Sequence, residues 1–522
     1  MVTATSVDLP PTQAAVSPRT LRDRLVPPIP GSRLWGWLGP LAITLVAGYL
    51  HFNRLSIPST KVFDEVYYTH DSLSLLHHGV ELNKDDNGAG YIVHPPLGKW
   101  MIAIGEWMFG DNSFGWRFTA AVFGTLAVLI LARTARRMTR STLLGCVAGL
   151  VMTLDGLEFV QSRTSMLDIF LMFWVVVAFA CLILDRDHVR SRLVQRMSPE
   201  DGDHGPKIGM RWWLLACGVA IGAATSVKWT GLYLIPAFGL LSLAWTMGAK
   251  RAIGVRKPFV STLMRDVAPA IGWLFIVPII VYLASWTGWF LNGPKYAWDR
   301  NWANGRPTAF GLGFIPAGIR NPIRGLWHYH SEMWNFHTHL TSYHTYRSNG
   351  WGWLFDTRPV LYYAGYPHPP ALGCTTGGLG CARMIYSLGT PAIWWASIPV
   401  MCFMLYLVFK RDWRGSALLV PFLLLYLPWL HFFKRTMFYF YALPLLPFIC
   451  IAIAVTIGYL IGPADATPNR RLFGTTVSGV YLLTVVVMFF YFLPILSAKT
   501  VPFTTGWQDR MWFQSWGEDK GS

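Results

Sequence analysis

Two adjacent carboxylates, Asp64 and Glu65, stand in the segment FDEVYYTHDS, directly after the first long apolar run of the chain. On a helix, neighbouring side chains point about 100° apart, so the two carboxylates cannot both address one substrate atom. One of them could act as a general base on a hydroxyl group while the other holds a backbone or sugar hydroxyl. Taken alone the pair is a weak signal, because acidic residues are also common at solvated helix starts.

A set of basic side chains stands near the ends of apolar runs, outside the short basic connections of the chain. Ionisable groups in such places are costly unless they are paired or functional. Several cations that converge at one membrane face suit a phosphate, so we expect a phospholipid-like substrate. The alternative for each base alone is that it reaches lipid headgroups or anchors a helix end. The candidate phosphate ligands are Arg117, Arg163, Lys228, Lys434 and Arg435.

The segment HPPLGKWMIAIGEWMFG, residues 94–110, is apolar but too short to span a bilayer. Lys99 and Glu106 are seven residues apart and therefore share one helical face, with Trp100 and Trp107 beside them. This pattern predicts an amphipathic helix in the membrane interface. The motif follows the acidic pair within one predicted loop, which strengthens the case for a site there. The motif residues that we include in the site are His94, Pro95, Pro96 and Lys99.

We expect no required metal or other cofactor, with a divalent metal as the alternative. The segment DDNG at 85–88 is better explained as a turn, since Asn-Gly favours turns. A group of histidines could form a zinc site, but its irregular spacing among aromatic residues favours acceptor contacts or interface anchoring. Several cations already serve the phosphate. These histidines are His328, His330, His337, His339 and His344.

The composition is that of a polytopic membrane protein. Of the 522 residues 53% are hydrophobic and only 14% are charged, which leaves too little polar surface for a soluble globule. The run 472–498 has no charged residue and is long enough to cross a bilayer. The net charge of +17 does not indicate nucleic-acid binding, because no compact basic domain accompanies it.

The basic residues predict the orientation in the membrane. Short connections rich in Lys and Arg belong on the cytoplasmic side, so the N-terminus is predicted inside and the tail from Lys499 outside. Two outer segments, 53–113 and 290–390, are too long to be mere connectors and are expected to carry function. The basic connections are 133–140, 185–197, 250–257, 410–414 and 469–471.

The fold class that we predict is an all-α bundle of about eleven transmembrane helices with interfacial helices in the first outer loop. The predicted spans are 35–52, 114–132, 142–160, 166–184, 212–227, 229–248, 268–289, 391–409, 415–431, 437–461 and 473–497.

These spans divide the chain into five predicted parts. Residues 1–34 are predicted to form a disordered cytoplasmic tail, and 35–289 an N-terminal transmembrane module that contains the first outer loop. A large outer loop (290–390), the C-terminal helices (391–497) and an outer tail (498–522) follow. Within the large loop, Cys374 and Cys381 could form a disulfide or remain free.

Six sequence motifs together carry a resemblance to a known family. FDEVYY, YIVHPPLGKW, WRFTAAVFG, SRTSMLDIFLMF, AATSVKWTGLY and RTMFYFYALP follow one another along the chain. This series resembles the protein O-mannosyltransferases in their actinobacterial form, without the β-trefoil insert of the eukaryotic enzymes. The resemblance covers nearly the whole chain. It implies a membrane glycosyltransferase with the C-type fold, which transfers mannose from a polyprenyl monophosphate to Ser or Thr of exported proteins.

The resemblance also implies roles for single residues. Asp64 is the expected general base, Glu65 its neighbour in the site, and Arg117 the expected ligand of the donor phosphate. One base and one anion site suffice for a single inverting displacement, because a phosphate leaves without protonation. Asp64, close to a helix N-terminus, is expected to stay ionised.

The expected location is the cytoplasmic membrane, with the active site on its outer face and the secretion channel as a further partner. Two other functions remain open. A related transferase could move the sugar to a glycolipid or polysaccharide, since this superfamily shares one architecture. A transporter would require broken helices at the midplane and repeat symmetry, and the sequence has neither.

Overall fold

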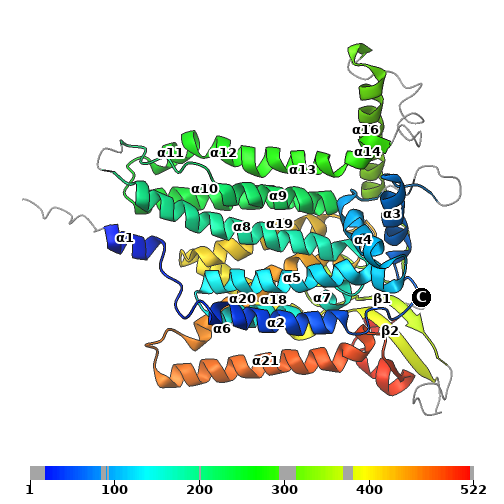
Figure 1. Cartoon of the computed structure of the whole chain (residues 1–522). Helices are drawn as coiled ribbons and strands as arrows, with labels where there is room; N and C mark the ends of the chain where they lie inside the picture. Colours follow the sequence, from blue (N-terminus) through cyan, green and yellow to red (C-terminus); the bar gives the residue numbers. More distant parts are fainter. Residues whose placement is uncertain are drawn as a thin grey trace, which may run out of the picture.

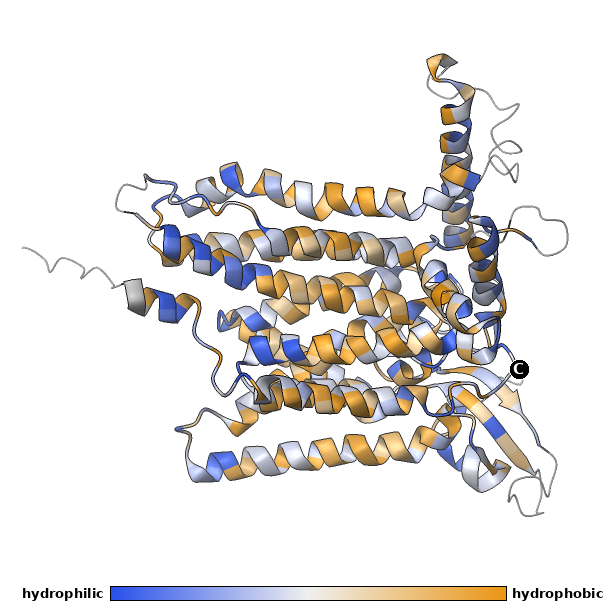
Figure 2. Ribbon diagram, viewed as in Figure 1, coloured by the Kyte–Doolittle hydropathy of each residue, from blue (hydrophilic) through white to orange (hydrophobic). Residues whose placement is uncertain are grey.

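A bundle of long helices runs side by side through the molecule, and short helices and a small sheet lie across one end of it (Figure 1). Apolar residues dominate the middle of the long helices, while hydrophilic residues gather toward their ends (Figure 2). This distribution is the one that a bilayer requires of a multi-pass membrane protein. The computed structural model describes residues 18–83, 90, 93–198, 202–292, 313–367 and 380–517.

Within the described residues, eight helices are long and apolar enough to cross a membrane. Two of them, α8 and the helix that contains α20, are the most buried and form the centre of the bundle. The eight are α5 (Ser113–Thr139), α8 (Leu167–Arg196), η1 with α10 (Trp229–Ala252), α12 to α13 (Val267–Ser285), α18 (Pro391–Phe409), α19 (Trp413–His431), η5 with α20 (Tyr439–Ile461) and α21 (Pro468–Leu496).

Three further predicted spans correspond to α2 (Trp35–Phe52), α6 (Thr142–Thr153) and α9 (Trp212–Val227). The last two are apolar but shorter. The predicted span 142–160 is wrong as one helix, because the chain breaks before α7 (Gly156–Gln161), whose first turn is capped by the Asp155 carboxylate. The count of eleven membrane-spanning helices therefore stays a prediction.

The first outer segment folds into α3 (Glu65–His78) and α4 (Leu97–Phe109), which lie against one end of the bundle (Figure 1). A helix in α4 was predicted, and its charged face points inward: Lys99 and Glu106 are buried, whereas Trp107 is 73% exposed. Only glycine permits the close crossing with α5, because a Cβ on Gly105 would lie 2.3 Å from the carbonyl oxygen of Gly115.

The second predicted outer segment, 290–390, begins within α14 (Thr287–Asn292) and contains α16 (Ala317–His339), α17 (Gly350–Trp353) and two strands. Strands β1 (Val360–Gly365), β2 (Cys381–Ser387) and β3 (Thr500–Pro502) form an antiparallel sheet in that order. The sheet is absent from the predicted all-α fold, and it ties the second outer segment to the predicted outer tail. The register between β2 and β3 pairs residues more than a hundred positions apart, which no local pattern could reveal.

Two further predictions concern the ends of the chain and the cysteines. The tail 1–34 was predicted disordered, but α1 (Pro18–Leu25) is helical, with Leu21 and Leu25 buried; residues 1–17 lie outside the described part. The basic connection 250–257 is followed directly by α11 (Pro258–Arg265). Cys381 is disulfide-bonded, whereas Cys374 lies outside the described residues.

Candidate active site

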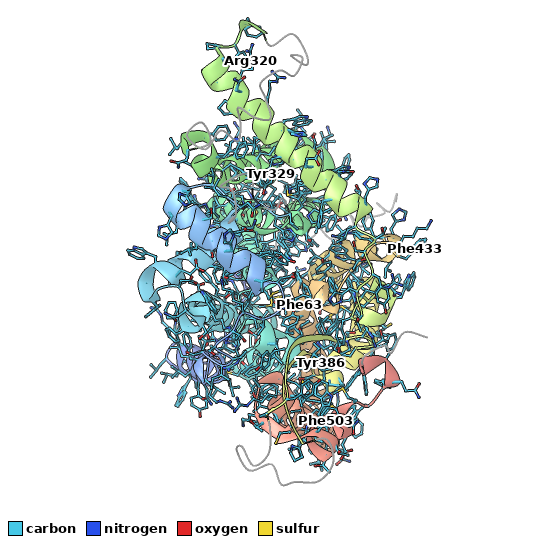
Figure 3. All side chains as sticks on the ribbon, turned by 90° about the vertical axis from the view of Figure 1, so that its right-hand side faces the viewer. Phe63, Arg320, Tyr329, Tyr386, Phe433 and Phe503 are labelled. Carbon is cyan, nitrogen blue, oxygen red and sulfur yellow. The ribbon has the colours of Figure 1, made fainter. Side chains whose placement is uncertain are left out.

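A cavity of about 320 Å³ opens at the end of the bundle that carries α3, α4 and α16. The view onto this end places Phe63 near its middle, with α16 running from Arg320 at the periphery past Tyr329 (Figure 3). Aromatic side chains make up much of the wall, and its polar members come from five separate segments. The polar and charged lining residues are His94, Asp168, Lys228, Thr230, Tyr233, His337, Thr338, Arg435 and Tyr441.

Lys228 and Asp168 form an ion pair in the cavity wall, with Nζ 2.7 Å from Oδ2. Asp168 lies in the first turn of α8, and Lys228 follows the last residue of α9. Both side chains are almost fully buried, with 7% and 2% of their surface exposed. The Lys228 ammonium also lies 5.2 Å from the centre of the Tyr441 ring. The carboxylate therefore pairs with the lysine ammonium in an otherwise aromatic wall.

Arg435 is the second cation of the cavity, and its bonding is incomplete. Nη2 donates to Nδ1 of His337 at 3.0 Å, and the guanidinium lies 5.9 Å from the Trp429 ring and 5.7 Å from the Tyr441 ring. Its Nε is buried and has no hydrogen-bond partner among the described residues. A guanidinium has five N–H donors, so this side chain retains capacity for an anion.

His337 fixes the orientation of Arg435. Its Nε2 lies 2.6 Å from the carbonyl oxygen of Val93, which can only accept, so Nε2 carries the proton and Nδ1 accepts from Arg435. Burial and the charge of Arg435 lower the pKa of His337 to about 4. The neutral ring therefore links the HPPLGK segment to the cation of the cavity.

Asp64 stands immediately before α3, held there by its neighbour Phe63. The ring of Phe63 stacks on Tyr362 at 4.7 Å and meets Phe440 edge-on, and the Phe63 backbone has φ +46°, which is uncommon for a bulky residue. Burial raises the pKa of Asp64 to about 6, with Lys228 lowering it, Asp168 raising it and a hydrogen bond from Tyr68 lowering it. The carboxylate is thus close to Lys228 and tuned toward a general base.

Glu65 points away from the cavity and into the protein. Its Oε1 accepts from Nε of Arg117 and from the backbone N–H of Ser165, at 2.8 and 2.9 Å. Its Oε2 accepts from Nη2 of Arg117 and from the backbone N–H of Val62, at 2.8 and 2.9 Å. The carboxylate has no exposed surface. Glu65 therefore joins three segments of the protein and has no lone pair directed at the cavity.

The predicted contact between Arg117 and a phosphate is at odds with the geometry. Besides binding Glu65, the guanidinium donates to the carbonyl oxygens of Leu55, Pro58 and Thr60 at 3.2, 2.7 and 3.0 Å. Its exposed surface is zero. All of its donors are used inside the protein, so a phosphate could reach it only after these bonds break.

Arg163 is likewise occupied elsewhere. Its Nη1 donates to the carbonyl oxygens of Leu50, His51 and Asn53, and Nη2 donates to that of Arg54. These are the carbonyl groups at the C-terminal end of α2, which an intrahelical bond cannot satisfy. Arg163 thus anchors a helix end, which was the alternative for each base taken alone.

The motif residues separate into two groups. His94 lines the cavity, and its ring lies 5.1 Å from that of His337. Lys99 lies elsewhere, fully buried between Asp71 and Glu81 at 2.9 and 2.8 Å. The Lys99 side chain therefore holds α3 to α4. Pro95 stands next to His94 and is buried. Outside the motif, Lys434 is exposed and does not line the cavity.

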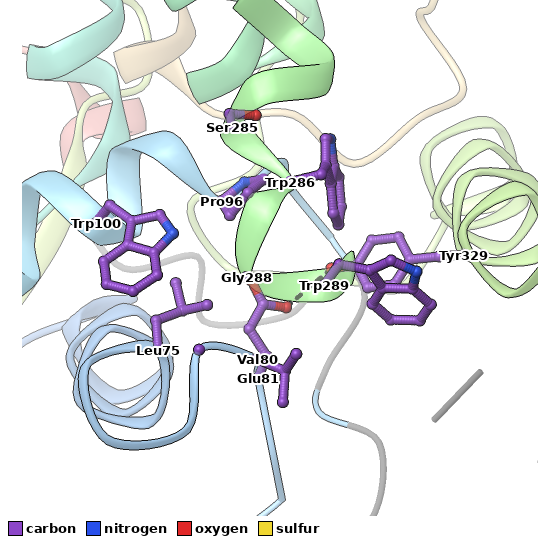
Figure 4. Close-up of a pocket in the computed structure, with 11 residues that line it drawn as sticks. Leu75, Val80, Glu81, Pro96, Trp100, Ser285, Trp286, Gly288, Trp289 and Tyr329 are labelled. Atoms are coloured by element: carbon purple, nitrogen blue, oxygen red, sulfur yellow. Dashed lines mark hydrogen bonds between the residues drawn. The ribbon is translucent and has the colours of Figure 1, made fainter. Parts of the chain in front are cut away.

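Pro96 lines a second, smaller cavity beneath α3, which Figure 4 shows. Its volume is about 20 Å³, enough for one water molecule and too small for a sugar. Tyr329 donates to Glu81 across it at 2.9 Å, the bond drawn in Figure 4. This cavity is a packing defect around the buried Lys99 cluster.

Among the described residues, no three His, Cys, Asp or Glu side chains are placed to share a metal ion. His330 instead bonds to Tyr282 at 2.7 Å, and His339 bonds to its own helix. The segment 85–88 lies outside the described residues.

Sequence reasoning did not assign Asp168, His337 or Tyr68 to the site. Asp168 has a sequence signal, an acid at the start of an apolar run. His337 was one of five candidate histidines, and no neighbouring residue in the sequence set it apart from the others. Its partners Val93 and Arg435 are remote in the chain. Chemically, the assembled group offers a carboxylate base, two cations for an anion and an aromatic wall for a sugar or lipid.

Comparison with known proteins identifies the family of the chain. The family model "Dolichyl-phosphate-mannose-protein mannosyltransferase" matches residues 41–292, and "C-terminal four TMM region of protein-O-mannosyltransferase" matches residues 322–516. In overall fold the chain is similar to a chain of the S. cerevisiae protein O-mannosyltransferase Pmt1-Pmt2 complex bound to the sugar donor. That match has a TM-score of 0.72 at 15% identity and covers 96% of this chain and 94% of the other.

Curated relatives extend over the same length. The chain is 37% identical to the polyprenol-phosphate-mannose–protein mannosyltransferase of Mycolicibacterium smegmatis (strain MKD8), over 99% of this chain and 100% of the relative. It is 36% identical to that of Corynebacterium glutamicum, over 94% of this chain and 96% of the relative. These matches confirm the resemblance carried by the sequence motifs, and the chain belongs to the protein mannosyltransferase family.

Proposed function

We propose that this protein transfers mannose from a polyprenyl monophosphomannose to Ser or Thr hydroxyls of exported proteins. Family membership and the relatives' names support the donor and the protein acceptor. The observation that carries the assignment of the site is Arg435, a cation in the cavity wall with a buried, unpartnered Nε. A phosphate oxygen there would complete its bonding.

The donor phosphate lies between Arg435 and Lys228 in this proposal. Asp168 partly balances Lys228, whereas Arg435 has no carboxylate within ion-pair distance among the described residues. Together the two cations match the charge of a phosphodiester and of the phosphate that leaves. Arg117, whose donors are all used by protein acceptors, and Arg163, whose Nη1 and Nη2 groups bind the end of α2, are left out of the phosphate site.

The mouth of the cavity suits a lipid chain. Leu232, Trp334 and Phe432 line it and are 46%, 63% and 39% exposed. Exposed apolar side chains of this kind at the end of a membrane bundle provide a path for a polyprenyl tail into the bilayer. The sugar would then stand against the aromatic wall, with the phosphate at the cations.

The reaction is a single inverting displacement. Asp64 takes the proton of the acceptor hydroxyl while its oxygen attacks the anomeric carbon from the face opposite the phosphate. The bond between that carbon and the phosphate oxygen breaks, and its electron pair stays on the polyprenyl phosphate beside Lys228 and Arg435. No acid is needed, since the phosphate leaves as an anion, and no metal takes part in this scheme.

The active site faces the outside of the cytoplasmic membrane in this proposal, with the N-terminus inside. The basic connections at the opposite end of the bundle support this orientation. An acceptor protein emerging from the secretion channel would reach the site from the outer face.

Arg435 and its neighbour Lys434 provide a matched test. Arg435→Ala should weaken binding of polyprenyl phosphomannose about 10- to 100-fold, the range expected for one charge-assisted bond. Lys434→Ala removes an equal charge one position away, outside the cavity, and should leave donor binding near wild type. Transfer of labelled mannose to a Ser/Thr peptide identifies the acceptor class. Equal losses in the two variants would reject the phosphate site, and transfer to glycolipid alone would reject the protein acceptor.

A further inference from the structure

A third cavity, of about 280 Å³, lies at the opposite end of the bundle, between α2, α5 and α8. Arg133, Arg136 and Arg137 on α5 line it together with apolar side chains. Arg133 is sixteen residues beyond Arg117 on the same helix, a rise of about 24 Å. The cavity is therefore near the other membrane interface, far from the mannose-transfer site. Its apolar walls are formed by Ile29, Trp37, Leu129, Ile130, Ala180, Ile183 and Leu184.

Two of the three arginines have no carboxylate to balance them. Arg137 pairs with Asp187 at 2.7 Å. Arg133 and Arg136 have no ion-pair partner among the residues that the structure describes. Three guanidinium groups within about one helical turn repel one another. An anion bound between them would offset this repulsion, so the arrangement favours anion binding.

The two unbalanced arginines are held in place rather than extended into solvent. Arg133 lies over the Trp37 ring, 3.7 Å from its centre, and donates to the carbonyl oxygen of Gly36. Arg136 is 7% exposed, and its Nε donates to the Thr142 hydroxyl at 2.9 Å. These contacts leave further N–H donors on both groups, since each guanidinium has five.

Gly36 makes room for Arg136. A Cβ at Gly36 would lie 2.5 Å from Nη2 of Arg136, closer than real Cβ contacts allow. The absence of a side chain at this position therefore lets the guanidinium reach the wall of the cavity.

We infer that this cavity binds the phosphate of an anionic membrane lipid, in the leaflet opposite the mannose-transfer site. The cations meet the phosphate, and the apolar walls between α2, α5 and α8 take the first carbons of the lipid chains. The volume is just below the usual range for small-molecule sites, which suits a headgroup and chain start rather than a whole lipid. Binding there joins α2 to α5 and α8.

Lipid binding can be measured on the intact protein by native mass spectrometry and by thermal unfolding in detergent. Phosphatidylglycerol should bind in preference to zwitterionic phosphatidylcholine and raise the melting temperature, because a ligand of the folded state stabilises it. The double variant R133Q/R136Q should bind phosphatidylglycerol at least about tenfold more weakly, because two charge-assisted bonds are lost. Arg251→Gln, an exposed arginine in the last turn of α10, is the matched control and should stay within about twofold of wild type.

Gly36→Ala provides a variant that keeps every charge. Only the end of a flexible arginine has to move to admit the methyl group, so the protein should fold and still lose affinity for phosphatidylglycerol. Glycerol 3-phosphate separates the two sources of the phosphate: stabilisation by it alone, as strong as that by the lipid, would assign the site to a soluble phosphate. No preference for the anionic lipid, or equal losses in Arg251→Gln, would overturn the inference.

Discussion

Glu65 and Arg117 form a bidentate ion pair, with Nε–Oε1 and Nη2–Oε2 distances of 2.8 Å, and neither side chain has exposed surface. Glu65 is the first residue of α3 and adjoins Asp64, so the pair fixes the proposed base relative to α5. The carboxylate beside the base is thus a positioning residue.

Arg117→Ala should therefore act first on stability. Removal of one partner leaves a buried, uncompensated carboxylate, which typically costs about 3–5 kcal/mol. We expect a lower melting temperature in detergent, with donor affinity per folded molecule little changed. Arg117→Lys should recover part of the stability, because lysine supplies the charge without the fork. A selective loss of donor affinity in a protein of normal stability would instead place Arg117 at the phosphate.

Asp64→Asn should abolish most of the transfer while donor binding persists. The amide keeps the shape but accepts no proton, and loss of a general base typically lowers the rate about 10²- to 10⁴-fold. Single-turnover transfer and donor binding are measured in parallel. Asp111→Asn, an exposed carboxylate on the same end of the protein, serves as the control. Near-normal turnover of Asp64→Asn would remove Asp64 as the base.

The pH dependence of transfer should follow Asp64. Its pKa is raised to about 6, and the active form is the deprotonated carboxylate. The rate constant of the chemical step should therefore rise with pH, reach half of its plateau near pH 6, and fall about tenfold for each unit below pH 5. Single-turnover rates from pH 4.5 to 8 test this profile. A midpoint near pH 4 would mean that the carboxylate is not buried during turnover.

His337 should act on donor binding through Arg435. His337→Ala removes the acceptor of the Nη2–H bond, so donor affinity should fall by less than in Arg435→Ala. The double variant should lose less than the sum of the two single losses, because both act on one contact. Additive losses in this cycle would show that His337 contacts the donor independently.

Single cysteines test the proposed orientation. Ser331 in α16 and Ser198 after α8 are exposed at opposite ends of the bundle. In intact cells an impermeant thiol reagent should label Ser331→Cys and leave Ser198→Cys unlabelled, whereas both should react after permeabilisation. The reverse pattern would invert the proposed topology.

The sequence by itself determined the class of the protein. Long uncharged runs can be satisfied only by membrane helices, so the multi-pass bundle could be predicted from composition and run length. The ordered motifs from FDEVYY to RTMFYFYALP placed the chain in its family. They also drew attention to Asp64, Lys228 and Arg435, each of which stands at the end of an apolar segment where a charge is costly.

Only the tertiary structure decided which of these charges serve the cavity. Arg117, Arg163 and Lys228 look alike in sequence, but burial and neighbours give them different tasks. Arg117 meets Glu65 and three carbonyl groups, Arg163 meets the end of α2, and Lys228 meets Asp168 in the cavity wall. These partners are about 50 to 110 residues away along the chain, and charge pairing at such separations depends on packing that no local pattern encodes. The same holds for His337 and for the sheet of β1, β2 and β3, whose partners are brought together only by the folded bundle.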